Sequence, residues 1–311
     1  MLKFIVRRVF WTIPVLLVVI FLTFTMMRQI GGNPFRQSER AVPEAVQRNL
    51  ERKFHTNDPW WKQYAYYVKG VATLDLGPSL VVRGRDVNDI VKTHFPKSVE
   101  LGLYAFLFAV VVGVPLGMIA ALRHNTIVDY GAMIFSNVFH ALPSFLIATL
   151  LIYYFALQWG DIFGLPTSGW TTWKHKILPS IALGFGPMAL FARLVRGTML
   201  ETLQQDYVRT ARAKGLRYRR VVGLHVLRNS LIPVVTAAGP LLGYIITGSF
   251  VIELIFNIPG IGQNYVNSVQ NRDFSVVMGL TVLLSVIVIV ANLVVDILYG
   301  ILDPRTRDAR A

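Results

Sequence analysis

Hydrophobic residues along this chain gather in long uncharged runs separated by polar segments. A helix needs roughly 20 apolar residues to cross a bilayer. Runs near this length are Val9–Met27, Leu101–Leu122, Tyr130–Gly160, Asn229–Ile252 and Phe274–Val295. A shorter run, Leu178–Ala192, becomes long enough if Arg193 and Arg196 extend their charged ends toward the headgroups. The pattern predicts an all-α integral membrane protein with six transmembrane helices.

Composition supports this class. The chain is 54% hydrophobic and 15% charged, too apolar for an ordinary soluble domain. It has no cysteine, which excludes disulfides, thiolate metal sites and cysteine nucleophiles. Lys3, Arg7 and Arg8 precede the first apolar run, as in a signal peptide. That run is too long for a signal-peptide core and no A-x-A-like cleavage site follows, so we expect an uncleaved first helix.

The net charge of +14 could suggest nucleic-acid binding, but the distribution of the positive charges along the chain fits membrane orientation instead. With the N-terminus inside, segments 1–8, 123–129, 193–228 and 303–311 carry sixteen Lys and Arg, whereas outer loops 158–177 and 253–273 carry three. The first outer loop is long, and long loops translocate largely regardless of charge. Both termini are therefore expected in the cytoplasm of a bacterial inner membrane protein.

This orientation predicts four regions along the chain. They are an N-terminal tail and first span (1–27), an extracytoplasmic loop (28–98), a core of five spans (99–303) with a cytoplasmic loop at 198–230, and a cytoplasmic tail (304–311).

Within the first outer loop, Asp58 is predicted as an N-cap with Pro59 at the first helical position. Behind it lie dense aromatics: Trp60, Trp61, Tyr64, Tyr66 and Tyr67. Such a helix is typical of the membrane interface, with substrate contact as the alternative.

Further along, the sequence from Leu76 to Ser79 indicates a turn. A short amphipathic helix is expected over Asp86–His94, closed by Pro96 before the second span begins near Ser98.

Proline and glycine are frequent in the second to fifth spans, for example at Gly113, Pro115, Gly117, Pro143 and Pro187. One interpretation is ordinary kinks with small residues that allow close helix packing. The other is a set of helices that bend around a translocation path, which makes these four spans the moving core.

The segment Asp206–Pro233 is basic, with seven Lys or Arg and one acid, yet it lies between two apolar spans. Asp206 is predicted as an N-cap, Tyr207–Lys214 as two helical turns and Gly215 as the C-cap glycine. A second helix is expected from Arg217 into the fifth span. So short a helix is marginal alone in water. We therefore expect a docking helix, with a small-residue face at Ala211 and Gly215 for a partner.

This segment resembles the loop with the "EAA" signature (E-A-A-x3-G-x9-I-x-L-P) of ABC importer membrane subunits. Gly215 and Leu227 match it, whereas Arg209-Thr210-Ala211 replaces Glu-Ala-Ala, His225 replaces Ile and Arg228 replaces Pro. The stretch from Asp206 to Leu216 resembles one branch, the first membrane subunit of dipeptide, oligopeptide and nickel importers. The resemblance extends through LPTSG (165–169), ILPSIALG (177–184), VIELIFNIPGIGQ (251–263) and NLVVDILYGILDPR (292–305).

The resemblance implies a type I ABC importer permease for peptides, with nickel, glutathione or haem as alternative cargo. It implies a second homologous permease, two cytoplasmic ATPase subunits or a fused one, and an extracytoplasmic substrate-binding protein. No G-x-x-x-x-G-K-[ST] loop is present, so ATP and Mg²⁺ belong to the ATPases and this subunit is not an enzyme. The residues expected to couple to the ATPase are Asp206, Tyr207, Arg209, Thr210, Ala211, Arg212, Lys214, Gly215, Leu216 and Arg217.

Polar groups inside the spans are candidates for the translocation path. They are Asn137, His140, Ser144, Thr247, Ser249, Asn292 and Asp296. Asp296 equally fits a pair with a basic residue, and His140 equally fits an interhelical hydrogen bond.

The segment 253–271 is interpreted as a re-entrant or surface turn that serves as an outer gate or binding-protein contact through Glu253, Asn257, Pro259 and Gly260. The scattered histidines give no metal-ligand spacing. A self-contained secondary transporter is the distant alternative, but neither an inverted repeat nor mid-membrane carboxylates are visible.

Overall fold

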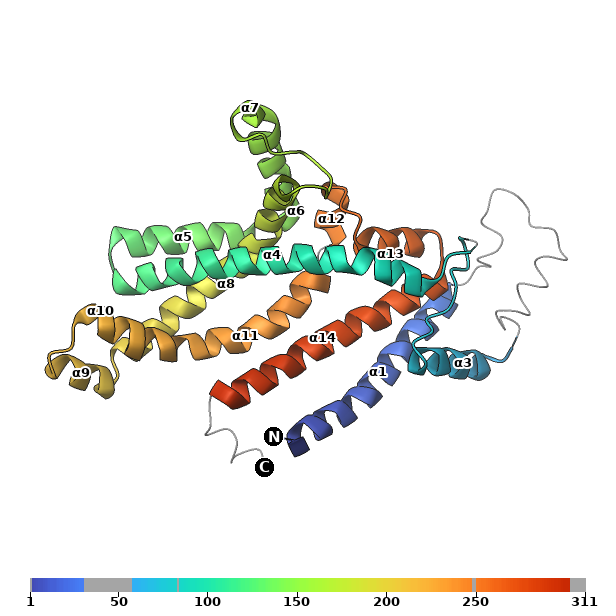
Figure 1. The fold of residues 1–311 in the computed structure, drawn as a ribbon, viewed down its shortest axis with the longest axis horizontal. Helices are drawn as coiled ribbons and strands as arrows, with labels where there is room; N and C mark the ends of the chain where they lie inside the picture. Colours follow the sequence, from blue (N-terminus) through green and yellow to red (C-terminus); the bar gives the residue numbers. More distant parts are fainter. Residues whose placement is uncertain (1, 31–57, 83, 248–249, 303–311) are drawn as a thin grey trace. The chain divides into compact units, whose positions relative to one another are not determined.

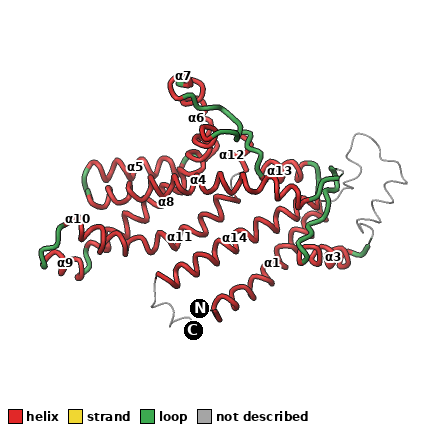
Figure 2. The backbone as a smooth tube through the Cα atoms, viewed as in Figure 1, coloured by secondary structure: helices red, strands yellow, loops and turns green. Residues whose placement is uncertain are grey.

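The computed structural model describes residues 2–30, 58–82, 84–247 and 250–302. These residues are mostly helices joined by short loops, which confirms the predicted all-α class (Figure 1, Figure 2). They belong to two compact units. One consists of residues 99–258 with 290–302, and the other of residues 2–98 with 259–289.

The predicted spans correspond to long apolar helices among the described residues. Four continuous stretches are long and apolar enough to cross a membrane: Phe10–Gln29, Val87–Leu122, Trp173–Leu203 and Phe274–Val294. A fifth candidate, Tyr218–Ile255, includes residues 248 and 249, which lie outside the described residues. The expected third span is instead a pair of helical stretches, Ile127–Ala141 and Ser144–Gln158, which are bent by 104°. If this pair crosses the membrane once, the total is six.

The break in the third span lies at Leu142 and Pro143. A residue before proline is disfavoured in the helical region, and Leu142 accordingly has an extended ψ of 130°. Pro143 is also non-helical, with ψ 139°. By contrast, the helix α8 (Trp173–Leu203) continues through Pro179 and Pro187. Of these three prolines, only Pro143 follows an extended residue, and only Pro143 divides its span.

The first unit is organised around α8. Helices α5 (Ile127–Ala141), α6 (Ser144–Leu151) and α11 (Arg228–Thr247) all pack on it. Phe139 of α5 stacks on Phe185 of α8 with ring centroids 4.0 Å apart. The other described elements of this unit are the part of α4 (Val87–Leu122) from residue 99, η2 (Ile152–Gln158), α7 (Gly160–Phe163), α9 (Asp206–Ala213), α10 (Tyr218–Arg220), η3 (Val221–Leu227), α12 (Phe250–Ile255) and the end of α14 (Phe274–Leu302).

Glycines of α4 allow its backbone to approach α8 closely. A Cβ placed on Gly117 would lie 2.3 Å from the carbonyl oxygen of Ala192, and one on Gly113 would lie 2.5 Å from that of Met188. On α8, a Cβ at Gly184 would lie 2.7 Å from a carbonyl oxygen of α4. The spacing of Gly113 and Gly117 is that of the small-xxx-small motif of membrane helix pairs. These glycines therefore serve close packing.

The second unit contains α1 (Leu2–Ile30), α3 (Trp60–Ala72), the first turns of α4, α13 (Ile261–Gln270) and α14 as far as residue 289. Ile20 and Met27 of α1 are buried with Val277, Met278 and Val282 of α14. This apolar burial is the main stabilising contribution to the unit.

The predicted aromatic helix of the outer loop is α3, and its aromatics divide between two sides. The Tyr64 hydroxyl donates a 3.0 Å hydrogen bond to the Leu17 carbonyl of α1. Tyr67 also packs inward; burial raises the pKa of its phenol. Trp60 and Trp61 are about half exposed, as expected of an interfacial helix.

Two helix boundaries in this region correct the sequence predictions. Pro59 rather than Asp58 is the N-cap of α3, with extended backbone at ψ 143°. Pro96 does not end a helix, because α4 is continuous from Val87 to Leu122. Proline inside a helix removes one backbone hydrogen bond, and α4 nevertheless continues through this position. No turn is present at Leu76–Ser79 as predicted; Gly77 has φ +80° and Pro78 forms an isolated β-bridge with Asp86.

Candidate functional site

The basic connector between α8 and α11 contains the short helix α9. It begins one residue earlier than the sequence predicted. Gln205 is the N-cap and makes no side-chain cap hydrogen bond, while Asp206 is the first helical residue. Asp206 is still favourable there, because its negative charge lies at the positive end of the helix dipole.

The C-terminus of α9 is closed as predicted. Lys214 is the C-cap and Gly215 follows with φ +77°. The Gly215 N–H donates to the Arg212 carbonyl at 2.9 Å, and the Leu216 N–H donates to the Ala211 carbonyl at 3.3 Å. This pair of bonds is the Schellman motif, which requires a left-handed residue where glycine has no Cβ penalty.

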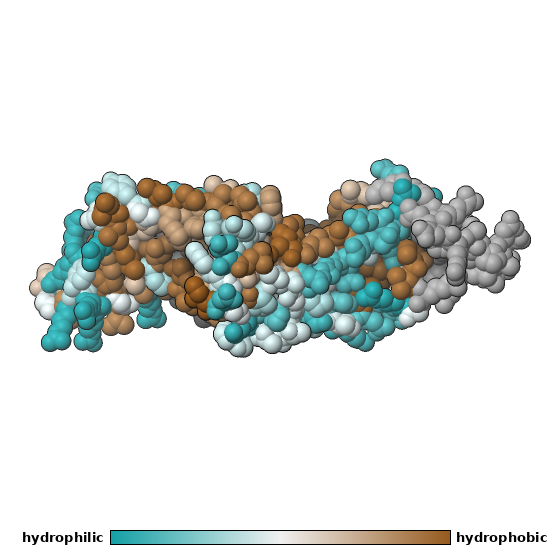
Figure 3. Space-filling view, turned by 90° about the horizontal axis from the view of Figure 1, so that it is seen from above, coloured by the Kyte–Doolittle hydropathy of each residue, from teal (hydrophilic) through white to brown (hydrophobic). Residues whose placement is uncertain are grey.

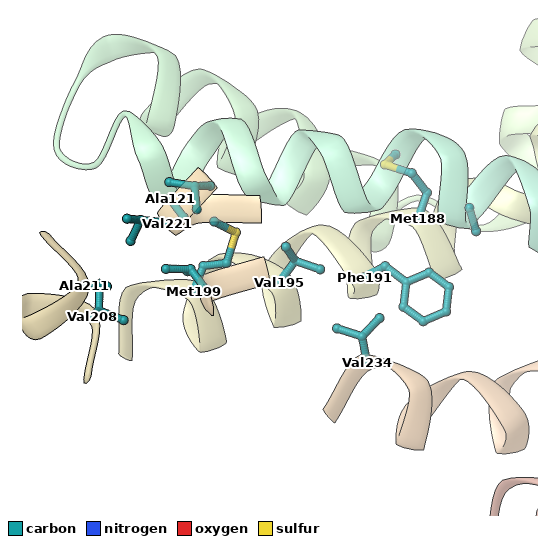
Figure 4. Packing of buried hydrophobic residues seen from close by; sticks show 12 residues of the cluster. Ala121, Met188, Phe191, Val195, Met199, Val208, Ala211, Val221 and Val234 are labelled. Carbon is teal, nitrogen blue, oxygen red and sulfur yellow. The ribbon is translucent and has the colours of Figure 1, made fainter. Parts of the chain in front are cut away.

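One side of α9 is buried in the core of its own chain. Val208 is fully buried and Ala211 is 7% exposed, in one cluster with Met199 and Val221 (Figure 4). The predicted small-residue face for a partner is therefore wrong at Ala211. Its small side chain lets α9 pack against the chain itself.

The opposite side of α9 and the turn after it are exposed and basic. The end of the molecule where Figure 1 shows α9 and α10 carries hydrophilic side chains in Figure 3. Arg212 lies over the ring of Tyr218 with its guanidinium carbon 5.4 Å from the centroid. The exposed coupling candidates are Asp206, Tyr207, Arg209, Thr210, Arg212, Lys214, Gly215, Leu216 and Arg217. Together they form a cationic surface suited to an acidic partner.

Three path candidates flank the break in the third span. Asn137 and His140 are exposed on the last turns of α5, and Ser144 is the half-buried first residue of α6. These three candidates thus lie close to the proline break along the chain.

The other path candidates are not gathered in this way. The Thr247 hydroxyl donates to the Gly243 carbonyl at 3.0 Å within its own helix. Asn292 is half-buried in α14, and Asp296 lies further along the same helix. Ser249 lies outside the described residues.

The predicted outer turn is partly helical. Glu253 is fully buried within α12, so its interpretation as part of a surface turn is wrong. Helix α13 occupies Ile261–Gln270, because Ile261 anchors an apolar face in the second unit. Between the two helices, Asn257 is exposed with φ +49°, a conformation that asparagine tolerates better than most residues.

Pro259 and Gly260 belong to the second unit, where polar groups of the first outer loop and α4 hold them. His94 Nδ1 donates to the Pro259 carbonyl at 2.9 Å, and Arg85 Nη2 donates to His94 Nε2 at 3.1 Å. Because a carbonyl only accepts and a guanidinium only donates, these two contacts make Nδ1 the donor and Nε2 the acceptor of the His94 ring. Gly260 is the N-cap of α13 and its carbonyl accepts from Asn264 at 3.1 Å.

Comparison with known proteins identifies the architecture. The family model described as "Binding-protein-dependent transport system inner membrane component" matches residues 113–308. The N-terminal membrane component model of the same transport systems matches residues 1–102. The chain belongs to this family. It is a multi-pass inner membrane permease, and ATP hydrolysis in such importers belongs to a separate subunit.

Named relatives of this permease match along its whole length. The dipeptide transport system permease protein DppB of Bacillus subtilis is 46% identical over 308 residues, covering 99% of this chain and 98% of that protein. The oligopeptide transport system permease protein OppB of Salmonella typhimurium is 47% identical over 311 residues, covering 99% and 100%.

Solved structures agree on the fold of the permease. A chain of the inward-facing MetNI methionine ABC transporter has a TM-score of 0.55 at 17% identity, covering 69% of this chain and 96% of that chain. A chain of an amino acid ABC transporter crystallised with histidines has a TM-score of 0.52 at 16% identity. The match covers 70% of this chain and 94% of that chain. The fold is therefore that of type I ABC importer permeases.

Sequence reasoning missed a buried ion pair in the permease. Asp129 is fully buried on α5 and receives two hydrogen bonds from Arg196 of α8, at 2.6 and 2.8 Å. Its carboxylate also accepts from the Asn125 N–H at 3.1 Å. Arg196 of α8 is thus the ion-pair partner of Asp129, a contact that the sequence did not reveal. The available signal was Asp129 itself, the one acid in the predicted inner segment 123–129.

A second missed cluster lies where α4 and α8 pack together. Glu100 is bonded to Lys176 and accepts from the indole N–H of Trp170 at 2.9 Å. The Lys176 ammonium also lies 5.5 Å from the Tyr104 ring centroid. These contacts fix the loop 164–172 to both helices.

Proposed function

We propose that this permease is the membrane-spanning subunit of an ATP-driven importer of di- and oligopeptides and forms half of the translocation path. The observation that carries the proposal is the full-length similarity, at 46% and 47% identity, to permeases named for dipeptide and oligopeptide transport. The path candidates around the break at Pro143 fit a polar lining for such a cargo.

The proposed partners are a second homologous permease, two cytoplasmic ATPase subunits or a fused one, and an extracytoplasmic substrate-binding protein. ATP and Mg²⁺ would bind in the ATPases. The exposed basic side of α9 would dock on an ATPase inside the cell, with residues 28–98 outside and 304–311 inside. ATP can shift the permease between inward- and outward-facing states only if the assembly closed around ATP binds one state better.

Uptake by a reconstituted transporter tests the cargo. The permease would be assembled in proteoliposomes with the second permease, ATPases and binding protein encoded with it. Labelled dipeptides and longer peptides should accumulate only with ATP. Accumulation of nickel, glutathione or haem in place of peptides would identify the alternative cargo, and ATP-independent uptake would contradict the importer itself.

The proposed orientation has a direct test, because the chain contains no cysteine. A single cysteine at the exposed Gln204 should react with an impermeant maleimide only in inverted vesicles. One at the exposed Trp61 should react only from the outside. The opposite pattern would reverse the assignment of α9 to the ATPase side.

Gly215 provides a test of coupling. A Cβ there meets nothing within 4 Å, so Gly215→Val introduces backbone strain at φ +77° rather than a clash. Left-handed backbone costs a side-chain residue about 1–2 kcal/mol, enough to unwind the last turn of an eight-residue helix. We expect membrane insertion to persist while peptide-stimulated ATP hydrolysis and uptake fall.

Gly215→Asn is the matched control, because asparagine is the residue that most often replaces glycine at this position. It should retain most of the activity. Normal stimulation and uptake in the valine variant would refute the role of α9.

A further inference from the structure

Two groups of hydrogen bonds hold the connector between the fourth and fifth spans. The first lies at its base, where α8 meets the start of α11. Thr198 Oγ1 donates to the Ser230 carbonyl at 2.9 Å, and the hydroxyls of Ser230 and Thr202 are 3.1 Å apart. Ser230 is 1% exposed, so these bonds are shielded from water. They fix the two spans to each other independently of α9.

The second group connects α9 itself to the fifth span. The Tyr207 hydroxyl accepts a 2.9 Å hydrogen bond from Asn229 Nδ2 and lies 3.4 Å from the His225 carbonyl, to which it donates. Asn229 Nδ2 also donates to that carbonyl at 3.0 Å. The three groups form a closed triangle. Tyr207 belongs to α9, His225 to η3 and Asn229 to α11.

The triangle lies at a junction between two kinds of helix. His225 is in the π-helical segment η3, and Asn229 is the second residue of α11. A π segment bonds each residue to the fifth residue along the chain and is frequent at functional sites. The Asn229 side chain therefore bonds a carbonyl where the helical register changes, and Tyr207 completes that interaction from outside the helix.

Among the described residues, α9 also contacts its own chain through Arg212, whose guanidinium lies over the Tyr218 ring, and through an apolar side. Val208 and Ala211 are buried in the core cluster. Hydrophobic contact opposes separation but is non-directional, so it allows one helix to slide on another. Hydrogen bonds depend on distance and angle, so the triangle resists sliding as well. A displacement of α9 is therefore passed to α11 through Tyr207 and Asn229.

We propose that Tyr207 and Asn229 are positioning residues that tie α9 to the fifth span and transmit its movement, with the Tyr207 hydroxyl bonded within this chain instead of to a partner. The proposal rests on the proposed role of α9 in coupling to an ATPase. It assigns to Asn229, which lies outside the predicted coupling set, a role in transmission. It also changes the role of Tyr207 from partner contact to internal link.

The test uses Tyr207→Phe, which removes only the hydroxyl, together with Asn229→Ala and the double variant. Tyr218→Phe is the matched control. It removes an exposed hydroxyl that makes no hydrogen bond among the described residues and keeps the ring under Arg212. Three quantities would be measured on the complete transporter: ATPase subunits retained on purification, ATP hydrolysed and peptide transported.

We expect each single variant to retain the ATPases but to transport about two- to tenfold less peptide per ATP hydrolysed, the range corresponding to one hydrogen bond. The double variant should be no worse than the more affected single variant, because both remove the same link. Tyr218→Phe should match the native ratio. A general loss of stability would instead reduce the amount of ATPase retained on purification and leave the ratio of peptide transported to ATP hydrolysed unchanged.

Native ratios in both single variants with ATPases bound would overturn the proposal, as would an equal loss in Tyr218→Phe. If the Tyr207→Phe variant fails to assemble with the ATPases, the ratio measured for Asn229→Ala, a substitution at an exposed residue, decides the test alone. Failure of the native chain to retain any ATPase would refute the proposed function, and the role of the link would fall with it. These outcomes are distinguishable because assembly and ratio are measured separately.

Discussion

A methyl group added at Gly117 tests the close approach of α4 to α8. The Cβ of Gly117→Ala would lie 2.3 Å from the Ala192 carbonyl oxygen, 2.9 Å from Val195 Cβ and 3.0 Å from the Ala192 carbonyl carbon. Favourable C···O contacts begin near 3.3 Å, so the two backbones must separate locally by about 1 Å. No rotamer change relieves this contact, because the opposing atom is backbone.

The expected cost follows from two opposing effects. Overpacking a core by one methyl group costs about 1–3 kcal/mol. Alanine in place of a helical glycine gains about 0.5–1 kcal/mol from the unfolded chain. Separation at Gly117 would also disturb the adjacent contact at Gly113. We therefore expect a net loss of about 2 kcal/mol, which lowers the unfolding midpoint of a unit of this size by about 4–8 °C.

Gly197→Ala on α8 is the matched control, because a Cβ there meets nothing within 4 Å. Both variants would be compared by thermal unfolding of the purified permease in detergent under identical conditions. The control should be unchanged or slightly more stable. An additional Ala192→Gly should not rescue Gly117→Ala, since the clash is with the carbonyl. A midpoint for Gly117→Ala at or above that of the control would refute the helix contact.

Two further predictions concern the buried ion pair and the broken span. Asp129→Asn leaves the Arg196 guanidinium, 26% exposed, without its anionic partner. The loss should be about 3 kcal/mol and lower the thermal midpoint of the detergent-solubilised permease. Pro143→Ala removes the constraint behind the 104° bend. Spin labels on cysteines introduced at the exposed Ile134 and Leu157 should move apart by up to about 10 Å if the helix becomes straight.

Each of these predictions has a control. Asp161→Asn removes an exposed carboxylate and should leave the midpoint unchanged, so an equal drop would argue against a special role for Asp129. Pro187→Ala lies in the continuous helix α8 and should not alter the label distance. An unchanged distance in Pro143→Ala would mean that packing against α8, rather than proline, maintains the bend.

The sequence predicted the elements whose signals are local. Long apolar runs gave the spans, since the length needed to cross a bilayer depends on nothing else in the fold. The closure of α9 was predictable because Gly215 meets a backbone requirement that few other residues meet. The fold class and the family follow from these signals together.

Proline illustrates why other features were not predictable. Pro96 lies inside α4 and Pro143 divides α5 from α6, yet both were interpreted from the same residue type. The outcome depends on whether neighbouring helices stabilise a continuous segment around the proline. Which helices neighbour a proline is a property of the tertiary structure, so the local sequence does not reveal it. The same reason concealed the pair of Asp129 and Arg196, which lie 67 residues apart.

Under the proposed role of α9 in coupling, the two sides of this short helix have different tasks. Its exposed side carries Arg209 and Arg212, whereas its inner side is held by Val208, Ala211 and the bonds of Tyr207. Charge on the exposed side governs the rate and strength of association with a partner. In the proposal, the bonded side governs how far a displacement of α9 reaches the fifth span. Substitutions on the exposed side should therefore change ATPase retention with a constant ratio of transport to hydrolysis, and those on the bonded side should do the reverse.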